Sequence, residues 1–461
     1  MNSHREASME RVRAVVLAAG IGKRMHSDLP KVLHPVCGQP LLVYVLDALA
    51  AAGIARPLIV VGHGADVVRE VAADRAEFVE QREQLGTGHA VRLALPLLDG
   101  SPDPVLVLYA DTPLLEAATI TRLVDLHRTS RAAATMLTAE LDSPSGYGRV
   151  IRRTDRVVTR IVEESDATPE EVRVREINAG TYVFEPGALS AGLAALRPTN
   201  RQGEYYLTDV IGWLLSRGHH VEALLADPEQ TMGINSRREL AAVEAVMRRR
   251  ILDRLMDAGV TIVDPAATYV HATVRVGRDT VVHPQSHLEG STVVGAGCTI
   301  GPQAQIVDTT LGDRVSVVAS TVEGSEVGEG TTIGPYSRLR PGSRIGRFVE
   351  IGNFAEIKNA VVGDYTKIHH KSYVGDATLG ARVNIGAGTV TCNYDGRQKH
   401  HTVIEDEAFI GSDTMLIAPV RVGRGAVTGA GAVVNKDVPP GGVAVGVPAR
   451  VIKYVKADAP R

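Results

Sequence analysis

The stretch Val327–Glu356 reads VGEGTT IGPYSR LRPGSR IGRFVE IGNFAE, five consecutive hexads that each begin with an aliphatic residue. The second residue of a hexad is usually glycine, and the fifth is usually small or β-branched. Three such hexads complete one triangular turn of a parallel β-helix, in which the aliphatic residue points inward and glycine relieves the corner. Coils stack at the strand spacing of about 4.8 Å, so the aliphatic side chains form one continuous core. This pattern decides the fold of the second half of the chain.

The hexads extend on both sides of this stretch. They run from Val276 to Gln305 as VGRDTV, VHPQSH, LEGSTV, VGAGCT and IGPQAQ. They recur as LGARVN and IGAGTV, and then as IGSDTM, LIAPVR and VGRGAV, ending near Val434. The segment CNYDGRQKHHT, residues 392–402, interrupts the repeat. Because insertions in a solenoid map to loops on one face, often the binding face, we expect a protruding loop there.

The first half has a different pattern, in which helical and strand signals alternate. Buried strands are expected at Ala14–Ala18, Leu58–Val61 and Val105–Tyr109, with helices between them. This alternation predicts a doubly wound, Rossmann-like α/β sheet. In such sheets the ligand lies beyond the carboxyl ends of the strands.

The turn after the first of these strands points to a polyphosphate ligand. The sequence LAAGIGKRM offers backbone amides at a glycine turn, followed by Lys23 and Arg24, and Lys31 lies behind Pro30. Amides at a strand-to-helix turn form a cradle for anions. The spacing nevertheless fits neither a dinucleotide fingerprint nor a Walker loop.

Four segments follow from these patterns: an α/β domain at 11–236, a linker helix at 237–262, a β-helix domain at 263–446 and a tail at 447–461. The linker begins at a capping box, Ser236 with Glu239, and continues with apolar residues at spacings of three and four. The basic tail has two interpretations, a disordered end or an anion contact through Arg450 or Lys453.

Composition restricts the class of protein. The chain has 461 residues and a net charge of −3, which argues against a general nucleic-acid or membrane binder. Its apolar segments are shorter than the roughly 18 residues of a membrane span, and the first residues form no signal core. The three cysteines, Cys37, Cys298 and Cys392, are far apart, which suits a reducing compartment. We expect a cytoplasmic protein that binds neither membrane nor nucleic acid.

Several motifs occur in one order along the first half: LAAGIGKRM, QLGTGHA, YADTP, SGYGRV, IVEE, INAGTY and GINSRREL. With them, this half resembles sugar-1-phosphate nucleotidylyltransferases. The second half resembles the left-handed β-helix of hexapeptide acyltransferases. Residues 11 to about 445 together resemble the family of bifunctional bacterial N-acetylglucosamine-1-phosphate uridylyltransferase/glucosamine-1-phosphate acetyltransferases.

The resemblance implies two reactions in the synthesis of UDP-N-acetylglucosamine, a precursor of peptidoglycan and lipopolysaccharide. Acetyl-CoA would acetylate glucosamine-1-phosphate, and UTP would then uridylylate N-acetylglucosamine-1-phosphate with release of pyrophosphate. It also implies Mg²⁺ as cofactor and a homotrimer, with acyl-CoA in the groove between neighbouring prisms.

For the uridylyl site, the resemblance implies Arg24 and Lys31 as catalytic residues and Asp111 and Asn235 as metal ligands. Taken alone, Asp111 is equally compatible with a cap of the following helix. Ala110 stands where that family has glycine, and its methyl group is expected to crowd the nucleotide slightly without loss of activity. The residues implied to contact UTP or the sugar product are Leu17, Ala18, Ala19, Gly20, Lys31, Gln81, Gly86, Thr87, Tyr109, Asp111, Gly148, Glu163, Asn178 and Asn235.

For the acetyl site, the resemblance implies His370, in IHHKSYVGD, as the general base. Spacing alone places either His369 or His370 at a solvated corner, and His369 adds a possible second charge next to the base. A histidine suits proton removal near neutral pH. The implied sugar-phosphate contacts are Arg340, Lys358, Tyr373 and Asn384, and the implied acetyl-CoA contacts are Ala387, Asn393, Tyr394, Ser412 and Ala430.

Two other functions fit parts of the sequence. In the first, the chain is a sugar-1-phosphate nucleotidylyltransferase whose β-helix only assembles subunits. The polar clusters HHKSY and NYDG argue against it, because a structural prism does not need them. In the second, the chain is a non-catalytic regulatory subunit, which the presence of Arg24, Lys31, Asp111 and Asn235 argues against.

Overall fold

The chain divides into two units, residues 1–247 and 248–461. The computed structural model describes residues 9, 11–98, 101–153 and 157–455. The division falls within helix α9 (Arg237–Asp257), inside the segment predicted as a linker helix. Val243, Met247 and Ile251 are buried, as their spacing along one face of this helix predicts. Within the described ranges, no helix has the length and apolar character needed to cross a membrane.

The first unit is built on one mixed sheet with the strand order β11-β7-β10-β6-β1-β4-β5. Strands β1, β4, β5 and β6 pair in parallel, whereas β10 runs antiparallel to both β6 and β7. A hairpin of β8 and β9 pairs with β10. The strands are β1 (Arg13–Leu17), β4 (Leu58–Val61), β5 (Glu77–Glu80), β6 (Val105–Tyr109), β7 (Ala134–Glu140), β8 (Arg149–Arg152), β9 (Val158–Val162), β10 (Glu176–Phe184) and β11 (Val221–Leu225), and a separate small ribbon joins β2 (Pro35–Val36) to β3 (Gln39–Pro40).

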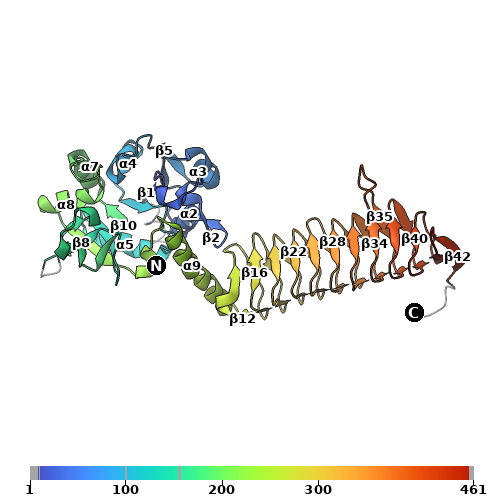
Figure 1. Cartoon of the computed structure of the whole chain (residues 1–461). Helices are drawn as coiled ribbons and strands as arrows, with labels where there is room; N and C mark the ends of the chain where they lie inside the picture. The colour runs from blue at the N-terminus through green and yellow to red at the C-terminus, as the bar shows by residue number, and fades with distance from the viewer. Residues whose placement is uncertain (1–8, 10, 99–100, 154–156, 456–461) are drawn as a thin grey trace. The chain divides into compact units, whose positions relative to one another are not determined.

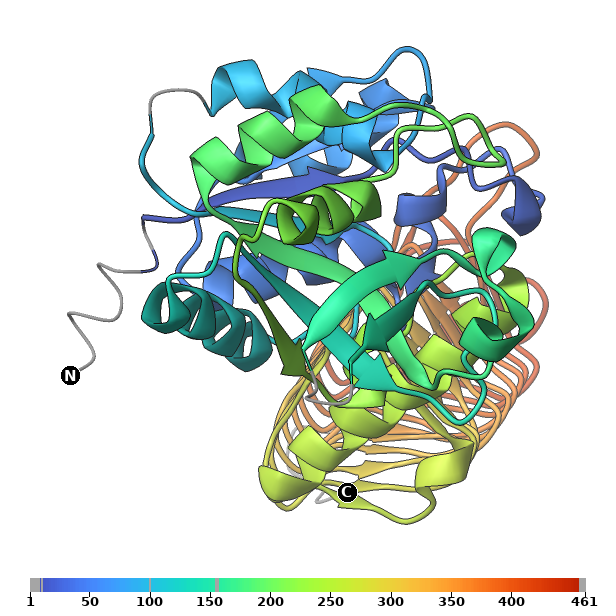
Figure 2. The same cartoon turned by 90° about the vertical axis from the view of Figure 1, so that its left-hand side faces the viewer.

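Helices cover both faces of this sheet (Figure 2). Alternate residues of β1 enter opposite cores: Ala14 and Val16 pack in one cluster, and Val15 and Leu17 pack in the other. Because β1 is buried on both faces, its sequence is a continuous run of apolar residues, and this run allowed the strand to be predicted. The helices are α2 (Leu41–Ala51), α3 (Ala65–Ala72), α4 (Thr87–Ala94), α5 (Ala117–Ser130), α6 (Pro169–Val172), α7 (Pro186–Ala195) and α8 (Thr208–Ser216).

The second unit is a parallel β-helix whose three sides are sheets of 12, 10 and 9 strands (Figure 1). The first sheet holds β12 (Thr261–Ile262), β15 (Val281–Val282), β18 (Thr299–Ile300), β21 (Ser316–Val317), β24 (Thr332–Ile333), β27 (Glu350–Ile351), β30 (Lys367–Ile368), β33 (Asn384–Ile385), β36 (Phe409–Ile410), β39 (Val427–Thr428), β41 (Gly442–Val445) and β42 (Arg450–Tyr454). The second holds β13 (Thr268–Val270), β16 (Ser286–Glu289), β19 (Gln305–Val307), β22 (Thr321–Glu323), β25 (Arg338–Arg340), β28 (Glu356–Lys358), β31 (Tyr373–Gly375), β34 (Val390–Cys392), β37 (Met415–Ile417) and β40 (Val433–Val434). The third holds β14 (Arg275–Val276), β17 (Val293–Val294), β20 (Thr310–Leu311), β23 (Glu326–Val327), β26 (Arg344–Ile345), β29 (Val361–Val362), β32 (Ala377–Leu379), β35 (Thr402–Ile404) and β38 (Val420–Val422).

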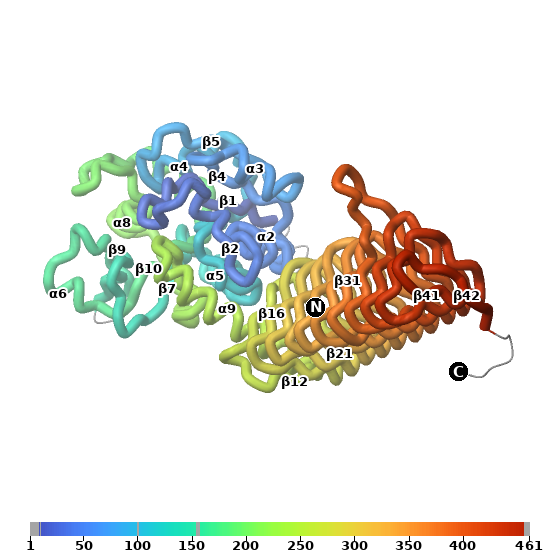
Figure 3. Tube along the Cα trace, turned by 45° about the vertical axis from the view of Figure 1, so that its right-hand side comes forward, coloured from blue at the N-terminus to red at the C-terminus, as the bar shows by residue number. Residues whose placement is uncertain are grey.

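The first residues of the hexads form the core of this prism. Ile351, Ile368, Ile385 and Ile410 follow one another in register through successive coils, and all are buried. The interruption predicted from the sequence leaves the prism between β34 and β35 as a loop, residues 393–401 (Figure 3). The column of aliphatic residues therefore continues past the insertion without a change of register.

The described part of the C-terminal tail is ordered. Strand β42 pairs antiparallel with β41. Residues 450–454 are therefore not a disordered end, which was one of the two possibilities for the tail. Residues 456–461 lie outside the described residues.

Candidate active sites

A cavity of about 600 Å³ opens in the first unit at the carboxyl ends of β1 and β6. Its walls come from the turn after β1, the segment around Gln81–Thr87, the end of β6, the β8–β10 region and the segment before α9. Every residue predicted to contact UTP or the sugar lines this cavity. Arg24 differs: it lies in the short 3₁₀ helix η1 (Lys23–Met25) with an exposed side chain, and its neighbour Lys23 lines the cavity instead.

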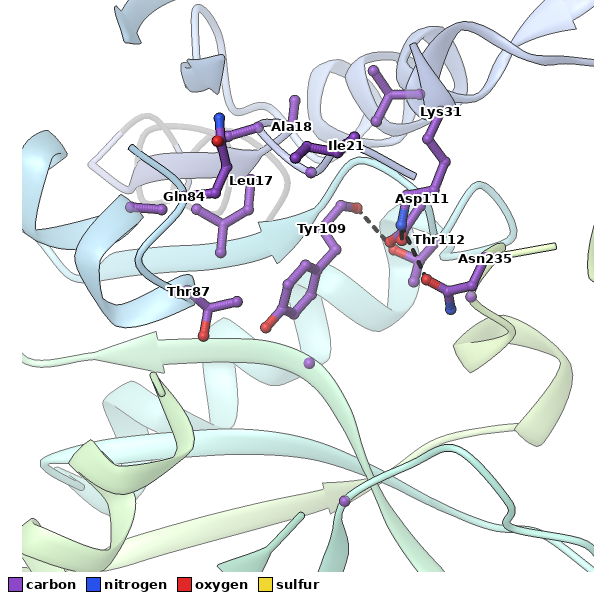
Figure 4. A pocket seen from close by; sticks show the side chains of 18 of the residues that line it. Leu17, Ala18, Ile21, Lys31, Gln84, Thr87, Tyr109, Asp111, Thr112 and Asn235 are labelled. Carbon is purple, nitrogen blue, oxygen red and sulfur yellow. Dashed lines mark hydrogen bonds and ion pairs between the residues drawn. The ribbon is translucent and has the colours of Figure 1, made fainter. Parts of the chain in front are cut away.

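Lys31, Asp111 and Asn235 meet at one end of the cavity (Figure 4). The Lys31 ammonium forms an ion pair with the Asp111 carboxylate and donates to the Asn235 amide oxygen at 3.1 Å. These residues come from three distant segments, η2 (Lys31–Leu33), the end of β6 and the start of α9. The predicted metal ligands therefore converge, with the predicted catalytic lysine between them.

Glycines in the turn after β1 have two different roles. At Gly22 the backbone has φ +66°, and an added Cβ would lie 2.8 Å from the Cβ of Lys31. This close approach is possible only for glycine, and it brings the turn against Lys31. Gly20 has open space where a side chain would be, so its backbone is accessible to a ligand in the cavity.

Gln81, Gly86 and Thr87, which are predicted substrate contacts, lie in and just after the segment that leads into α4. Gln81 is buried, and its Nε2 donates to the Gly86 carbonyl at 3.1 Å. Gly86 has φ +108°, and an added Cβ would lie 2.6 Å from the Tyr205 carbonyl oxygen. Glycine is thus required here by the close approach of the Tyr205 backbone.

Another part of the cavity lining carries a half-buried carboxyl group, that of Glu163. Burial raises the pKa of Glu163 above its ordinary value, while a hydrogen bond from Thr208 Oγ1 at 3.1 Å opposes that rise. Gly148 lies so close that an added Cβ would be 3.3 Å from Glu163 Oε2. Asn178 donates to the Tyr182 hydroxyl at 2.6 Å. A carboxyl group and an amide in this part of the lining suit the hydroxyl and acetamido groups of a sugar.

Tyr109 also lines the cavity, and Figure 4 shows its hydroxyl directed toward Thr87. Burial raises the pKa of its phenol, so it is a neutral donor at physiological pH. Gly180 makes room for this ring, because an added Cβ would lie 2.4 Å from it. Gly180 has φ +75°, at the irregularity of β10 between Asn178 and Tyr182.

The acetyl-site residues of the second unit fall into two groups, and the first is a column at one corner of the prism. Ile368, Ile385, Ile410 and Thr428 pair in register, and His370, Ala387, Ser412 and Ala430 each lie two residues later. Backbone hydrogen bonds tie the column together, from Gly388 N–H to the His370 carbonyl and from Gly431 N–H to the Ser412 carbonyl. The predicted base and the three small residues predicted for acetyl-CoA thus stack on successive coils.

One coil before His370, the same corner position is occupied by Asn353. Its Oδ1 lies 3.1 Å from His370 Nδ1, so it accepts a hydrogen bond from the protonated Nδ1 and leaves Nε2 free to accept a proton. Asn353 was not predicted from the sequence, although it follows Ile351 as His370 follows Ile368 one coil later. Asn384, the remaining predicted sugar contact, lies in β33 of the 12-stranded sheet.

The second group gathers around Asp376. Arg340 and Lys358 are register partners on adjacent strands of the 10-stranded sheet. Lys358 Nζ lies 3.9 Å from Asp376 Oδ2, and Asn393 donates to the same carboxylate. Asn393 Nδ2 is also 3.5 Å from the Tyr373 hydroxyl. Two cations side by side near hydroxyl and amide groups fit a sugar phosphate.

The inserted loop adds a further cation to this group. Lys399 lies against Lys358, and this neighbour lowers the pKa of Lys399. Asp395 holds the loop by accepting from the backbone N–H groups of Arg397 and Gln398, while Tyr394, which bridges to Lys399 across the loop, is exposed. Lys399 was not predicted from the sequence, since the loop was recognised only by its NYDG start.

His369 faces away from the column. Its Nε2 lies 2.8 Å from Glu350 Oε2, and Lys367 forms an ion pair with the same carboxylate at 3.0 Å. The positive charge that was expected beside His370 is therefore matched by Glu350.

Comparison with known proteins places both units. Residues 14–205 match the MobA-like NTP transferase domain family, and residues 324–359 and 401–436 match the bacterial transferase hexapeptide family. The protein named bifunctional protein GlmU of Heliobacterium modesticaldum is 51% identical over 438 residues, which cover 95% of this chain and 96% of that protein. The bifunctional protein GlmU of Pelotomaculum thermopropionicum is 54% identical over 88% of this chain and 89% of its own length, and that of Brevibacillus brevis is 46% identical over 95% of each.

The chain belongs to the bifunctional GlmU family. It is a bifunctional uridylyltransferase and acetyltransferase, with a nucleotidyltransferase unit followed by a hexapeptide unit. The predictions of a Rossmann-like α/β unit and a left-handed parallel β-helix are confirmed. One detail of the sheet was not predicted, namely the antiparallel strand β10, which is mostly buried, like its neighbour β6.

Ala110, the one departure from the family's motif, lies in the core and not in the lining of the cavity. Ala110, expected to crowd the nucleotide, is fully buried within the core cluster that also contains Leu108 and Ala179. Its methyl group fills core volume, so the expected crowding is wrong.

The donor set at Asp111 and Asn235 fits a magnesium ion. Mg²⁺ prefers oxygen ligands and is usually held by one or two carboxylates together with substrate phosphates and water. Here one carboxylate oxygen and one amide oxygen already face a single positive group. Among the described residues, no cluster of three or more His, Cys, Asp or Glu side chains offers an alternative all-protein metal site.

The reciprocal capping box predicted at the start of α9 is changed by one residue. Ser236 Oγ accepts from the Glu239 N–H at 3.3 Å, but the Glu239 carboxylate accepts from the Asn235 N–H at 2.7 Å. Glu239 therefore fixes the backbone of a predicted metal ligand. In addition, the Asp111 carbonyl accepts from the Ile234 N–H at 3.0 Å, which holds the two predicted ligands together.

Proposed function

We propose that this chain makes UDP-N-acetylglucosamine in two steps, acetylation of glucosamine-1-phosphate by acetyl-CoA and then uridylylation of the product by UTP. The observation that carries the proposal is the presence of two separate polar sites, a nucleotide-sized cavity in the first unit and a histidine column on the second. A β-helix that only assembled subunits would not need the second of these sites.

In the uridylyl site, the backbone at Ala18–Gly20 receives the phosphates of UTP, and Lys31 neutralises the charge that develops on them. Arg24 adds to this neutralisation by turning its exposed side chain toward the cavity that its neighbour Lys23 already lines. Such transfers depend mainly on positioning and electrostatic stabilisation. The sugar phosphate oxygen attacks the α-phosphorus, and the bond to pyrophosphate breaks. Asp111 and Asn235 hold Mg²⁺, which supplies further neutralisation of the phosphates.

Two parts of the cavity lining select the substrates. Gln81, Gly86 and Thr87 contact uracil, and Gly148, Glu163 and Asn178 contact the N-acetylglucosamine moiety. Support comes from the lining of the cavity, which contains all six of these residues together with Tyr109.

In the acetyl site, His370 Nε2 removes a proton from the amine of glucosamine-1-phosphate as its nitrogen attacks the thioester carbonyl. A C–N bond forms, the C–S bond breaks, and coenzyme A leaves as the thiol after it takes up a proton. Arg340 and Lys358 hold the phosphate, with Lys399 beside them, and Tyr373 and Asn384 hold the sugar. Acetyl-CoA lies along the column Ala387, Ser412 and Ala430, where small side chains leave room for its arm, next to Asn393 and Tyr394.

The cytoplasm as location and a homotrimer as assembly belong to the same proposal. The trimer has support from two exposed aromatic stacks on the prism, Tyr336 on Phe354 and Phe348 on Tyr365. Exposed apolar groups in such number are typical of a contact surface. Sedimentation equilibrium of the full chain measures the assembly directly.

The test of the function is to incubate the protein with glucosamine-1-phosphate, acetyl-CoA, UTP and Mg²⁺ and to follow products by mass spectrometry. UDP-N-acetylglucosamine is expected, and it must disappear when acetyl-CoA is omitted. If the protein instead couples only N-acetylglucosamine-1-phosphate or another sugar phosphate to UTP, the β-helix is a scaffold and the proposal is wrong.

A further inference from the structure

Lys31 occupies the position at which a metal ion would meet its two protein ligands. Its ammonium forms an ion pair with Asp111 and is 3.1 Å from the Asn235 oxygen (Figure 4). The side chains of Lys31 and Asp111 are only 13% and 14% exposed, so water screens this pair weakly. A surface lysine with an accidental partner would be far more exposed.

The surroundings hold all three groups in this arrangement. Gly22 packs against the Lys31 Cβ, with no space for a side chain of its own. The Asp111 carbonyl is bonded to Ile234 N–H, and the Asn235 N–H is bonded to Glu239. The two oxygen atoms are therefore fixed by the fold, whereas the Lys31 ammonium is the mobile end of a flexible chain.

One pair of oxygens cannot serve both cations at once. Mg²⁺ binds its oxygen ligands at about 2.1 Å and requires near-octahedral geometry, which an ammonium between the same oxygens prevents. We propose that Lys31 is a tethered cation that balances Asp111 before substrate binds and is displaced when the metal binds. This inference rests on the proposed function, which assigns Asp111 and Asn235 to the metal.

Displacement also explains how Lys31 can pair with Asp111 before substrate binds and with the nucleotide phosphates afterwards. The metal arrives with the nucleotide, whose phosphates give the released ammonium a new anionic partner in the same cavity. Metal alone must break the ion pair without that compensation. We therefore expect the protein to bind the metal weakly when nucleotide is absent. Metal and nucleotide are expected to bind the protein together.

The experiment measures Mn²⁺ binding to the full-length protein without nucleotide, by the loss of the free-ion signal in electron paramagnetic resonance. Lys31→Met leaves the buried Asp111 unpaired, so it is expected to bind Mn²⁺ at least about 10-fold more tightly than the natural protein. The matched control is Lys23→Met, which removes the same charge from the lining of the same cavity without touching Asp111. We expect its affinity to change by no more than about 2-fold, because that side chain is exposed and screened.

The proposal is wrong if Lys31→Met binds Mn²⁺ no more tightly than the natural protein does. It is also wrong if Lys23→Met gains as much Mn²⁺ affinity as Lys31→Met, because the gain would then be a general effect of removing a positive charge. The double variant Lys31→Met with Asp111→Asn separates this inference from the assignment of the metal site. Loss of the tight binding in the double variant supports both. Unchanged tight binding places the metal elsewhere and overturns both. A Lys31→Gln variant, with Mn²⁺-dependent thermal stabilisation as readout, repeats the test if Lys31→Met folds poorly.

Discussion

The two units build their polar sites in different ways. In the first unit, residues from segments more than 200 positions apart, such as Lys31 and Asn235, converge in one cavity. In the second, His370, Ala387, Ser412 and Ala430 lie on an exposed corner and are brought together by coil register alone. The α/β site therefore depends on packing and burial, whereas the β-helix site depends on a repeat that places one residue per coil.

The largest expected effect separates the two sites at His370. His370→Ala should lower acetyl transfer by roughly 10²–10⁴-fold, the usual contribution of a general base, and should leave uridylyl transfer intact. Thiol release and pyrophosphate release measure the two reactions separately. His369→Ala is the control, since its ring pairs with Glu350, and it should lower acetyl transfer far less. Survival of both activities in His370→Ala would show that the base is elsewhere.

A change at Asp111 is expected to have the opposite result, a loss of uridylyl transfer with acetyl transfer retained. Asp111→Asn should reduce uridylyl transfer by at least about 100-fold, because changes even to groups behind a metal ligand cost 10–100-fold. Acetyl transfer by the same protein should be unchanged. Pyrophosphate release at increasing Mg²⁺ concentration provides the measurement, and full activity at ordinary Mg²⁺ would contradict the assignment.

A smaller effect on acetyl transfer is expected at Asn353, which supports His370 from the preceding coil. Asn353→Ala removes the acceptor of the His370 Nδ1–H, and acetyl transfer should fall about 10-fold, the scale of one hydrogen bond. Nitrogen NMR of His370 should show the proton on Nδ1 in the natural protein and a mixture of tautomers in the variant. A fall in activity with no change of tautomer would assign Asn353 to the fold of the corner instead.

The smallest effect concerns stability and the half-buried carboxyl group. Burial raises the pKa of Glu163, so the folded state keeps this proton at a pH where the unfolded chain has lost it. Stability is therefore lost as pH rises from the ordinary value of 4.5 through the raised one. Glu163→Gln should unfold about 2 °C higher near neutral pH, with no gain below the ordinary value. Calorimetry across this range checks it, and a gain independent of pH would contradict the cause given.

The sequence predicted the β-helix well because its signal is local: each hexad carries its own inward aliphatic residue, as at Ile351 and Ile368. It predicted the cavity residues through motifs, but not their neighbours. Gly180 accommodates Tyr109, and Gly86 accommodates the Tyr205 backbone. These contacts join distant segments, and nothing in the order of residues records them. Asn353 could have been predicted, because it lies one coil before His370 at the same position of the repeat.

The central claim is that two complete and separate sites act in series. The most direct measurement mixes the Asp111→Asn and His370→Ala proteins with glucosamine-1-phosphate, acetyl-CoA, UTP and Mg²⁺ and follows UDP-N-acetylglucosamine by mass spectrometry. Neither variant should make the product alone, and the mixture should restore it, because acetylated intermediate released by the first protein is uridylylated by the second. Absence of product from the mixture, with each remaining half-reaction intact, would contradict two independent sites.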